Sequence, residues 1–267
     1  MRKNKRATIH AIAVIVCLFF FACATNNAVI ENQQLAVKSF DGSPITYGVK
    51  GQNAPTLLFI HGWLGDHTIW RSQIDNFSKK YKVAWLDLAG HGNSKANRKI
   101  FTMSAFAQDV VSVVDVNEVD GEKIILVGHS MGGPVAVEAA NLLGEKVVGI
   151  VGVDAFYTPL AAVPEEKKLN FIEKLKTDYP NALAETVSAM FTQNADPELK
   201  ALTFQNMLAA DHKMGISALH ECIKWNSRKE PLELKKFSDK LYNINAAPTG
   251  NQKTLHKNVV LLSLIHI

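Results

Sequence analysis

The sequence predicts an α/β protein with a parallel central sheet, and two observations lead to this prediction. Short, wholly apolar runs alternate with helix-patterned stretches, as expected for parallel strands joined by crossover helices. In addition, Gly128-His129-Ser130-Met131-Gly132 follows the apolar run 124–127 and continues into an Ala-rich stretch with a helical pattern. A strand that ends in G-x-S-x-G and passes directly into a helix is typical of a nucleophile elbow, which presents a serine hydroxyl at a sharp turn.

The expected elements follow one another along residues 35–257. A β-hairpin is predicted over 35–49, because alternating residues flank Asp41-Gly42. Buried strands are predicted at 56–60, 83–86, 124–127 and 147–153, and helices at 70–81, 103–116 and 133–143. From Pro164 to about Trp225 only helical stretches occur. The sequence therefore predicts a helical insertion, placed at about 160–232, before a further strand at 241–245 and a helix at 249–257.

The first 22 residues have the pattern of a targeting segment. Four basic residues precede an almost wholly apolar stretch (9–21), which is short for a membrane span, and small residues follow at Ala22 and Ala24. Cys23 resembles the acylated cysteine of bacterial lipoproteins, so we expect export to the cell envelope and a lipid anchor at Cys23 that holds the protein to a membrane. Cleavage after Ala24 without lipidation and an uncleaved membrane anchor are the alternatives.

Charge and cysteine content set further expectations. The chain has 29 Lys and Arg against 25 Asp and Glu, and the four basic residues of the leader account for the excess. The mature chain is then neutral at pH 7, which gives no reason to expect a nucleic-acid partner. Cys17 leaves with the leader, so Cys222 has no disulfide partner once Cys23 is acylated. No residues have metal-ligand spacing, and neither a metal nor an organic cofactor is expected.

The last six residues, 262–267, are interpreted as an artefact. Their sequence, LSLIHI, is what the transposon-end adaptor of DNA sequencing libraries encodes. The native chain is therefore expected to be readable only to about Leu261. A genuine short apolar strand at this end is the alternative.

Four features together resemble the α/β-hydrolase fold family over residues 35–261: the elbow at 128–132, the His61-Gly62 loop, the loop 87–94 (D-x-x-G-H-G-x-S) and the helical insertion after Asp154. The resemblance implies a Ser–His–acid triad and a helical cap inserted after the sixth strand. It implies Ser130 as the nucleophile, with the backbone N–H groups of Trp63 and Met131 as oxyanion donors. It further implies that His61, His91 and Asp87 support the structure of their loops and that His129 faces away from the site, so that these histidines are minor alternatives for the general base.

The acid and the base depart from the commonest family pattern. The loop 246–249 holds no carboxylate, so Asp154, an alternative position in the family, is expected to be the triad acid; a structural Asp at a strand end is the alternative. No Gly-His occurs after residue 132. His256 falls in a predicted helix and His266 in the suspect peptide, while His212 and His220 are expected at the surface or along a pocket. We expect that the base was lost with the native C-terminus, which would leave this chain nearly inactive.

The expected function is hydrolysis of an uncharged ester or related acyl compound. Acyltransferase and cofactor-free haloperoxidase-like activities stay open. Epoxide hydrolases and haloalkane dehalogenases are disfavoured because those relatives carry Asp in place of Ser130. A non-catalytic binding protein on the same scaffold is the alternative from another class. Five cap residues suggest an apolar pocket, although helix-spaced apolar residues are more often core: Phe171, Met190, Phe191, Met207 and Trp225.

Overall fold

The computed structural model describes residues 35–119, 123–156, 163–228, 230–246 and 259–262. The chain divides into two units, 1–35 and 36–267, and the described helices and all of the sheet except Leu35 belong to the second unit. The expected leader with Cys23, the expected helix 249–257, His256 and His266 lie outside the described residues. Within the described ranges, no helix is both long enough and apolar enough to cross a membrane.

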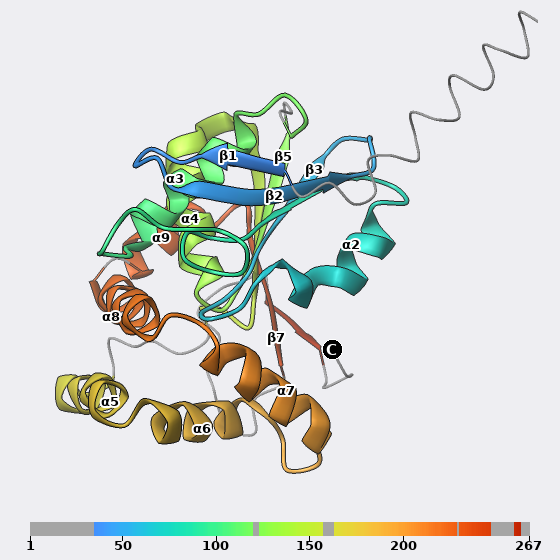
Figure 1. The fold of residues 1–267 in the computed structure, drawn as a ribbon. Coiled ribbons are helices and arrows are strands. Elements are labelled where there is room, and N and C mark those ends of the chain that lie inside the picture. The colour runs from blue at the N-terminus through green and yellow to red at the C-terminus, as the bar shows by residue number, and fades with distance from the viewer. Residues whose placement is uncertain (1–34, 120–122, 157–162, 229, 247–258, 263–267) are drawn as a thin grey trace, which may run out of the picture. The chain divides into compact units, whose positions relative to one another are not determined.

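An eight-stranded sheet forms the centre of the second unit (Figure 1). The strand order is β1-β2-β4-β3-β5-β6-β7-β8. Strands β3 to β8 pair in parallel, whereas β2 pairs antiparallel with β4. The strands are β1 Leu35–Lys38, β2 Pro44–Lys50, β3 Thr56–Ile60, β4 Lys82–Leu86, β5 Ile124–His129, β6 Val147–Val153, β7 Leu241–Ala246 and β8 Val259–Leu262. The mostly parallel α/β fold predicted from the sequence is confirmed.

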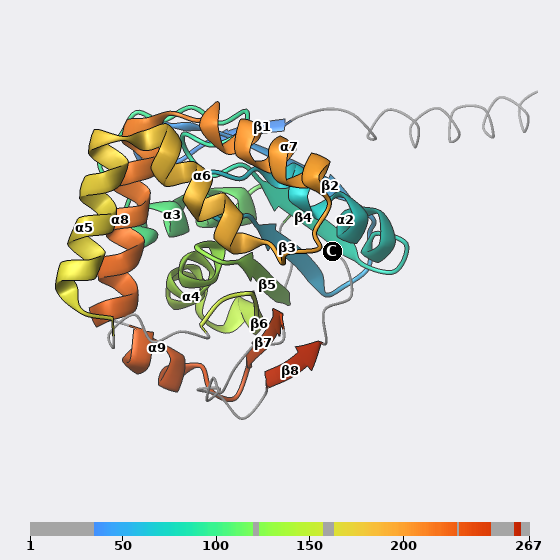
Figure 2. The same ribbon diagram turned by 90° about the horizontal axis from the view of Figure 1, so that it is seen from below.

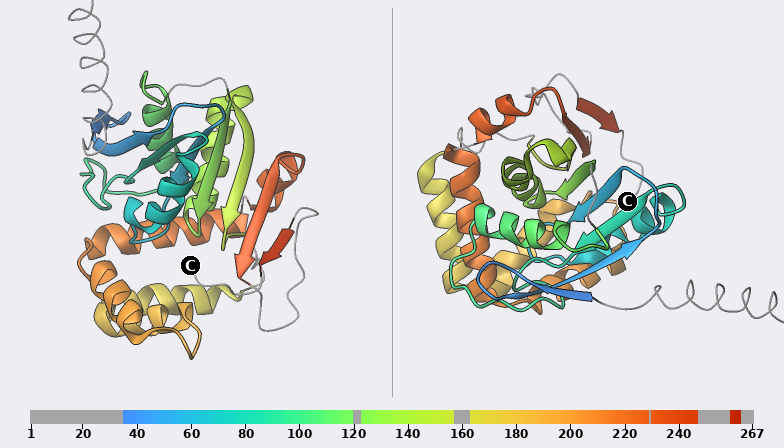
Figure 3. Two further views of the ribbon diagram at one scale, coloured as in Figure 1. Left: turned by 90° about the vertical axis from the view of Figure 1, so that its right-hand side faces the viewer. Right: turned by 90° about the horizontal axis from the view of Figure 1, so that it is seen from above.

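Crossover helices lie on both faces of this sheet. They are η1 His67–Trp70 and α2 Arg71–Phe77 between β3 and β4, α3 Met103–Val114 before β5, and α4 Gly132–Leu143 with η2 Gly144–Lys146 before β6. In the sheet, β4 lies on one side of β3, and β5 and β6 lie on the other side. The crossover from β3 to β4 therefore moves along the sheet in the opposite direction to the crossovers from β4 to β5 and from β5 to β6. Because such crossovers are right-handed, α2 lies on one face and α3 and α4 on the other (Figures 1 and 3).

The two faces of the sheet are buried to different degrees. Side chains that point toward α3 and α4 are completely buried, as Leu58, Ile60, Leu126 and Ile150 show. On the opposite face, Trp70 and Ile74 of η1 and α2 pack on β3 and β4. Farther along this face, over β5 to β7, Ile125, Val151 and Val153 are only partly buried and Tyr242 is 46% exposed. The core is therefore deepest between the sheet and α3–α4.

Four helices, which we call the cap, follow β6 and lie below the carboxyl ends of the strands (Figures 1 and 2). They are α5 Glu165–Thr177, α6 Tyr179–Met190, α7 Pro197–Leu208 and α8 His212–Arg228; α9 Glu230–Lys236 then leads into β7. The cap falls after the sixth strand, as predicted. One sequence-based boundary was wrong: the helix expected to reach Tyr81 ends at Phe77, because the N–H groups of Lys80 and Tyr81 turn back to the Phe77 carbonyl before β4 begins.

Candidate active site

Ser130 lies at a sharp turn between β5 and α4. Its φ of +49° is in the left-handed region, which a residue with a Cβ adopts only under strain. Two glycines allow the turn: a Cβ on Gly128 would collide with the carbonyl of Gly132, and one on Gly132 would lie 2.5 Å from the carbonyl oxygen of Ile60. The N–H of Ser130 donates to the Val153 carbonyl (2.9 Å), which fixes the turn to β6. Ser130 itself is exposed, as a nucleophile that meets a substrate has to be.

The loop after β3 lies against this serine. A Cβ on Gly62 would lie 3.3 Å from Ser130 Cβ and 2.9 Å from His129 Nδ1, so a side chain here would push the loop away. Trp63 follows directly, and its indole N–H donates to the carbonyl of Gly215 in α8 (2.8 Å). Met131 stands at the N-terminus of α4, where the helix dipole favours negative charge. The two residues expected to supply oxyanion donors thus lie on segments that adjoin Ser130.

Asp154 is next to the elbow at the carboxyl end of β6. His129 and Val153 are partners in the parallel register, so the residues that follow them, Ser130 and Asp154, lie at the same edge of the sheet. Asp154 also has a left-handed φ of +45°, and its N–H donates to the Ile244 carbonyl on β7 (2.9 Å). A carboxylate at this edge is suitably placed to orient a histidine that serves Ser130.

His61 and His91 are buried in the scaffold beneath these loops. The Nδ1 of His61 lies 2.8 Å from the Gly62 carbonyl oxygen, and its Nε2 accepts the N–H of Leu88 (3.0 Å), so the proton is on Nδ1 and the ring is neutral. Burial lowers the pKa of His61, and it lowers the pKa of His91 to about 3. The two ring centroids are 5.0 Å apart. Each ring lies at hydrogen-bond distance from a carbonyl oxygen of its own loop, Gly62 for His61 and Ala89 for His91.

Asp87 organises the loop after β4, as expected. Its carboxylate accepts the N–H groups of His67 (2.8 Å) and Asn93 (2.9 Å) and also contacts the His67 ring at Nδ1 (2.8 Å). The hydrogen bond to Asp87 raises the pKa of His67. Burial acts to raise the pKa of Asp87, but the bonds from His67 and Asn93 outweigh it and the pKa is lowered. This ion pair joins the loops after β3 and β4, and no local sequence pattern singles out His67 for it.

The ring of His129 is enclosed rather than presented to substrate. It lies against Gly62, with its centroid 6.3 Å from the Trp70 ring, and burial lowers its pKa although the charge of Asp154 acts to raise it. Among the hydrogen bonds of the described residues, none joins a histidine to the Ser130 side chain. The described part of the chain therefore contains the expected nucleophile and acid without a histidine bonded to Ser130.

A buried carboxylate connects the cap to α3 and α4, the helices on one face of the sheet. Glu138 in α4 accepts the indole N–H of Trp225 in α8 (2.6 Å) and the hydroxyl of Ser104 in α3 (2.7 Å). Trp225, one of the five residues suggested to line an apolar pocket, thus connects the cap to α4. Met190, another of the five, is 55% exposed. Sequence reasoning missed Glu138, although a single charge inside the apolar stretch 132–143 was a usable signal.

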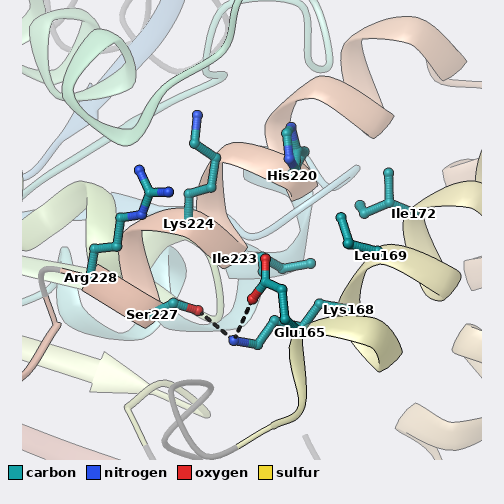
Figure 4. A pocket seen from close by; sticks show the side chains of 9 residues that line it. All are labelled: Glu165, Lys168, Leu169, Ile172, His220, Ile223, Lys224, Ser227 and Arg228. Atoms are coloured by element: carbon teal, nitrogen blue, oxygen red, sulfur yellow. Dashed lines mark hydrogen bonds and ion pairs between the residues drawn. The ribbon is translucent and has the colours of Figure 1, made fainter.

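A cavity of about 160 Å³ lies between α5 and α8 within the cap (Figure 4). Its buried cation, Lys168, points to Glu165 Oε2 (3.3 Å) and Ser227 Oγ (2.9 Å), so its charge is already compensated. His220 is at the rim, in agreement with a surface or pocket-lining position. No lining residue belongs to the loops around Ser130, so this cavity is separate from the candidate active site. Within the described ranges, no group of three or more His, Cys, Asp or Glu side chains could hold a metal ion.

Comparison with known proteins agrees with this geometry. The model of the alpha/beta hydrolase fold family matches residues 55–246. The chain belongs to this family. It is 36% identical over 110 residues to the dihydrolipoyllysine-residue acetyltransferase component of the acetoin cleaving system from Cupriavidus necator, over 41% of this chain and 29% of that protein. It is 31% identical over 128 residues to a protein named as an esterase/lipase from Haemophilus influenzae, over 48% of this chain and 44% of that protein.

The chain therefore spans less than half of the length of these two curated relatives. Among solved structures, the family member resembles an esterase from Exiguobacterium antarcticum with a TM-score of 0.71 at 18% identity. That match covers 86% of this chain and 90% of the esterase. At such low identity the likeness establishes the fold, while the reaction has to be argued from the site.

Proposed function

We propose that this α/β-hydrolase-fold protein is a serine hydrolase that acts on uncharged esters or related acyl compounds. The observation that carries the proposal is an exposed Ser130 on a strained turn, with the Gly62 loop against it and Asp154 at the same edge of the sheet. The Haemophilus relative, which is named as an esterase/lipase, supports ester chemistry.

The proposed reaction has two stages. Ser130 Oγ attacks the acyl carbon while a histidine, oriented by Asp154, takes its proton. The backbone N–H groups of Trp63 and Met131 stabilise the oxyanion that forms. The alcohol leaves with the proton from the histidine, and water then hydrolyses the acyl-enzyme by the same route and regenerates Ser130.

The base in this proposal is a histidine outside the described residues. The support is that His61, His91 and His129 are enclosed with lowered pKa values, while the ring of His67 is engaged by Asp87. We take His266 to be a decoy within the adaptor-like peptide. Residues 1–267 alone are accordingly proposed to be a strongly impaired enzyme, because a triad without its base retains little catalysis.

We also propose that the mature protein is held at the bacterial envelope by a lipid on Cys23. The support is the order of basic, apolar and small residues in 1–24. The protein should partition into detergent, and Cys23→Ala should release it into the aqueous phase. An unmodified N-terminus at Thr25 in mass spectrometry would contradict the anchor.

Because residues 262–267 are interpreted as an adaptor artefact, the 3′ end of the gene is first resequenced. Hydrolysis of 4-nitrophenyl butanoate by the product of this resequenced gene then tests the proposed reaction. Ser130→Ala is expected to lower kcat/KM by at least about 10³-fold, and Asp154→Asn by up to about 10⁴-fold, with both variants folded. Asp75→Asn, at a surface ion pair with Lys50, is the matched control and should keep the rate. Undiminished turnover by Ser130→Ala would overturn the proposal, and binding of the ester by the wild type without turnover would favour a binding protein.

A further inference from the structure

One hydroxyl of the cap is buried without a partner. Tyr179, the first residue of α6, is 6% exposed, and its hydroxyl oxygen makes no hydrogen bond. Within the described cap, residues 163–228, no other buried side-chain nitrogen or oxygen lacks one. A buried polar group left unpaired destabilises the fold, so a ligand that bonds to this hydroxyl would be stabilised by the hydrogen bond it supplies.

The Tyr179 hydroxyl is close to the loop that adjoins Ser130. A Cβ on Gly215, in the first turn of α8, would lie 3.2 Å from this hydroxyl oxygen and 2.7 Å from Leu64 Cδ2. The carbonyl of Gly215 accepts the indole N–H of Trp63 (2.8 Å). The hydroxyl therefore lies where the cap meets the loop after β3. This loop contains Leu64 and, two residues earlier, Gly62, which lies against Ser130.

The ring of Tyr179 is held in a fixed orientation. It stacks on the ring of His212, with centroids 3.8 Å apart and planes 17° from parallel. The Nε2 of His212 lies 3.2 Å from the carbonyl oxygen of Leu208 at the end of α7, which restrains the stacking partner in turn. A hydroxyl held in this way can bond a ligand with little loss of side-chain entropy.

The electrostatic surroundings indicate which kind of ligand this hydroxyl suits. Burial, helped by the charge of Asp211, raises the pKa of Tyr179 to about 12, so the group stays a neutral donor at physiological pH. Asp211 is fixed close by, because its carboxylate accepts the N–H of Met214 at the start of α8 (2.7 Å). A neighbouring carboxylate disfavours an anionic ligand, which leaves a neutral acceptor oxygen as the matching partner.

We propose that Tyr179 Oη donates a hydrogen bond to a neutral acceptor oxygen of the substrate that is separate from the scissile carbonyl. The cap would then select esters with a second oxygen over plain alkyl esters. This inference rests on the proposed function, because it assumes an ester bound between the cap and Ser130. The indole N–H of Trp63 does not compete for the same oxygen, since Gly215 already accepts it.

Equilibrium binding in a Ser130→Ala background tests this, because esters then bind without being cleaved. Isothermal titration calorimetry would compare pentyl butanoate with 2-ethoxyethyl butanoate and 3-methoxypropyl butanoate, in each of which an ether oxygen replaces one methylene of the pentyl chain. At least one ether analogue should bind more tightly than pentyl butanoate. Adding Tyr179→Phe should weaken that analogue about 3- to 10-fold and leave pentyl butanoate unchanged. Tyr242→Phe, at an exposed tyrosine on β7, is the matched control and should alter neither.

Several outcomes would overturn the inference. Tyr179→Phe could weaken every ester equally or none, or no ester could bind. The melting temperature is a second readout: Tyr179→Phe should keep or raise it, whereas a fall of several degrees would mean that the hydroxyl is bonded within the free protein. Turnover by the protein with Ser130 intact is measured separately. A protein that binds ether esters through Tyr179 but never cleaves them would refute only the proposed function.

Discussion

Backbone strain is concentrated around Ser130. Within the described residues, the non-glycine residues with positive φ are Leu64, Ser130, Asp154 and Phe156, and they lie in the loops after β3, β5 and β6. Such strain persists where the surrounding structure enforces it, as at functional sites. Ser130 and Asp154 were predictable because each follows an apolar strand in a recognisable pattern. Leu64 and Tyr179 were not, because their positions depend on contacts between the β3 loop and the cap that no local pattern encodes.

Acid sensitivity is the first residue-scale prediction. His61, His91 and His129 have pKa values lowered by burial, whereas an unfolded histidine titrates near 6.5. Below about pH 6.5 the unfolded chain therefore binds protons that the folded protein does not. As a result, the free energy of unfolding decreases as the pH is lowered. His67 acts oppositely: its raised pKa stabilises the fold below pH 6.5, and this contribution is lost as pH rises through the folded-state value.

Urea unfolding between pH 7 and pH 5 checks this expectation. His91→Gln should remove up to one proton from those taken up on unfolding. The slope of unfolding free energy against pH should therefore decrease by up to about 1.4 kcal/mol per pH unit. Gln52→Asn, at an exposed position, is the control and should leave the slope unchanged, because it removes no titratable group. An identical slope in His91→Gln and wild type would mean that the His91 ring is not the neutral, buried group described here.

At the level of elements, the strands were more predictable than the cap. β3 is a short apolar run that is buried at every position, and the less completely buried β5 and β6 also begin as apolar runs, so these strands can be located from the sequence. The cap helices were predictable as helices but not as neighbours. The contact of α8 with α4 depends on Trp225 and Glu138, and the contact of α8 with the β3 loop depends on Gly215 and Trp63, each pair being far apart in sequence.

The unequal burial of the two sheet faces leads to an element-scale prediction. Ile124 is completely buried toward α3 and α4, whereas its neighbour Ile125 on the other face is only partly buried. Ile124→Ala should cost about 2–5 kcal/mol of unfolding free energy, and Ile125→Ala distinctly less, because less apolar surface is lost and water can fill the space. Chemical denaturation measures both, and equal losses would contradict the described asymmetry.

At the scale of the whole molecule, the family places the site without naming the substrate. The fold brings the loops after β3, β5 and β6 to one edge of the sheet, and the cap connects to that edge through Trp63 and Gly215. The same scaffold carries many activities, so family membership alone does not select an ester. The sequence predicted this edge of the sheet and Ser130. The contacts between the edge and the cap, such as Trp63 with Gly215, could be identified only in the three-dimensional structure.

The proposed loss of the base gives a prediction for the chain as a whole. Residues 1–267, purified as given, should hydrolyse 4-nitrophenyl butanoate at a rate close to that of their own Ser130→Ala variant. His266→Ala should have no effect on this rate, because His266 is taken to be a decoy. A robust rate that falls on changing His266 would contradict both the adaptor interpretation and the assignment of the base.

Ser130 is proposed to be an activated nucleophile, and covalent labelling with an active-site reagent is a direct test of this role. The product of the resequenced gene is treated with a fluorophosphonate and analysed by intact-protein and peptide mass spectrometry. We expect one phosphonyl group per chain, located on Ser130, and no labelling of Ser130→Ala. A label that persists in Ser130→Ala, or that maps to another residue, would contradict it.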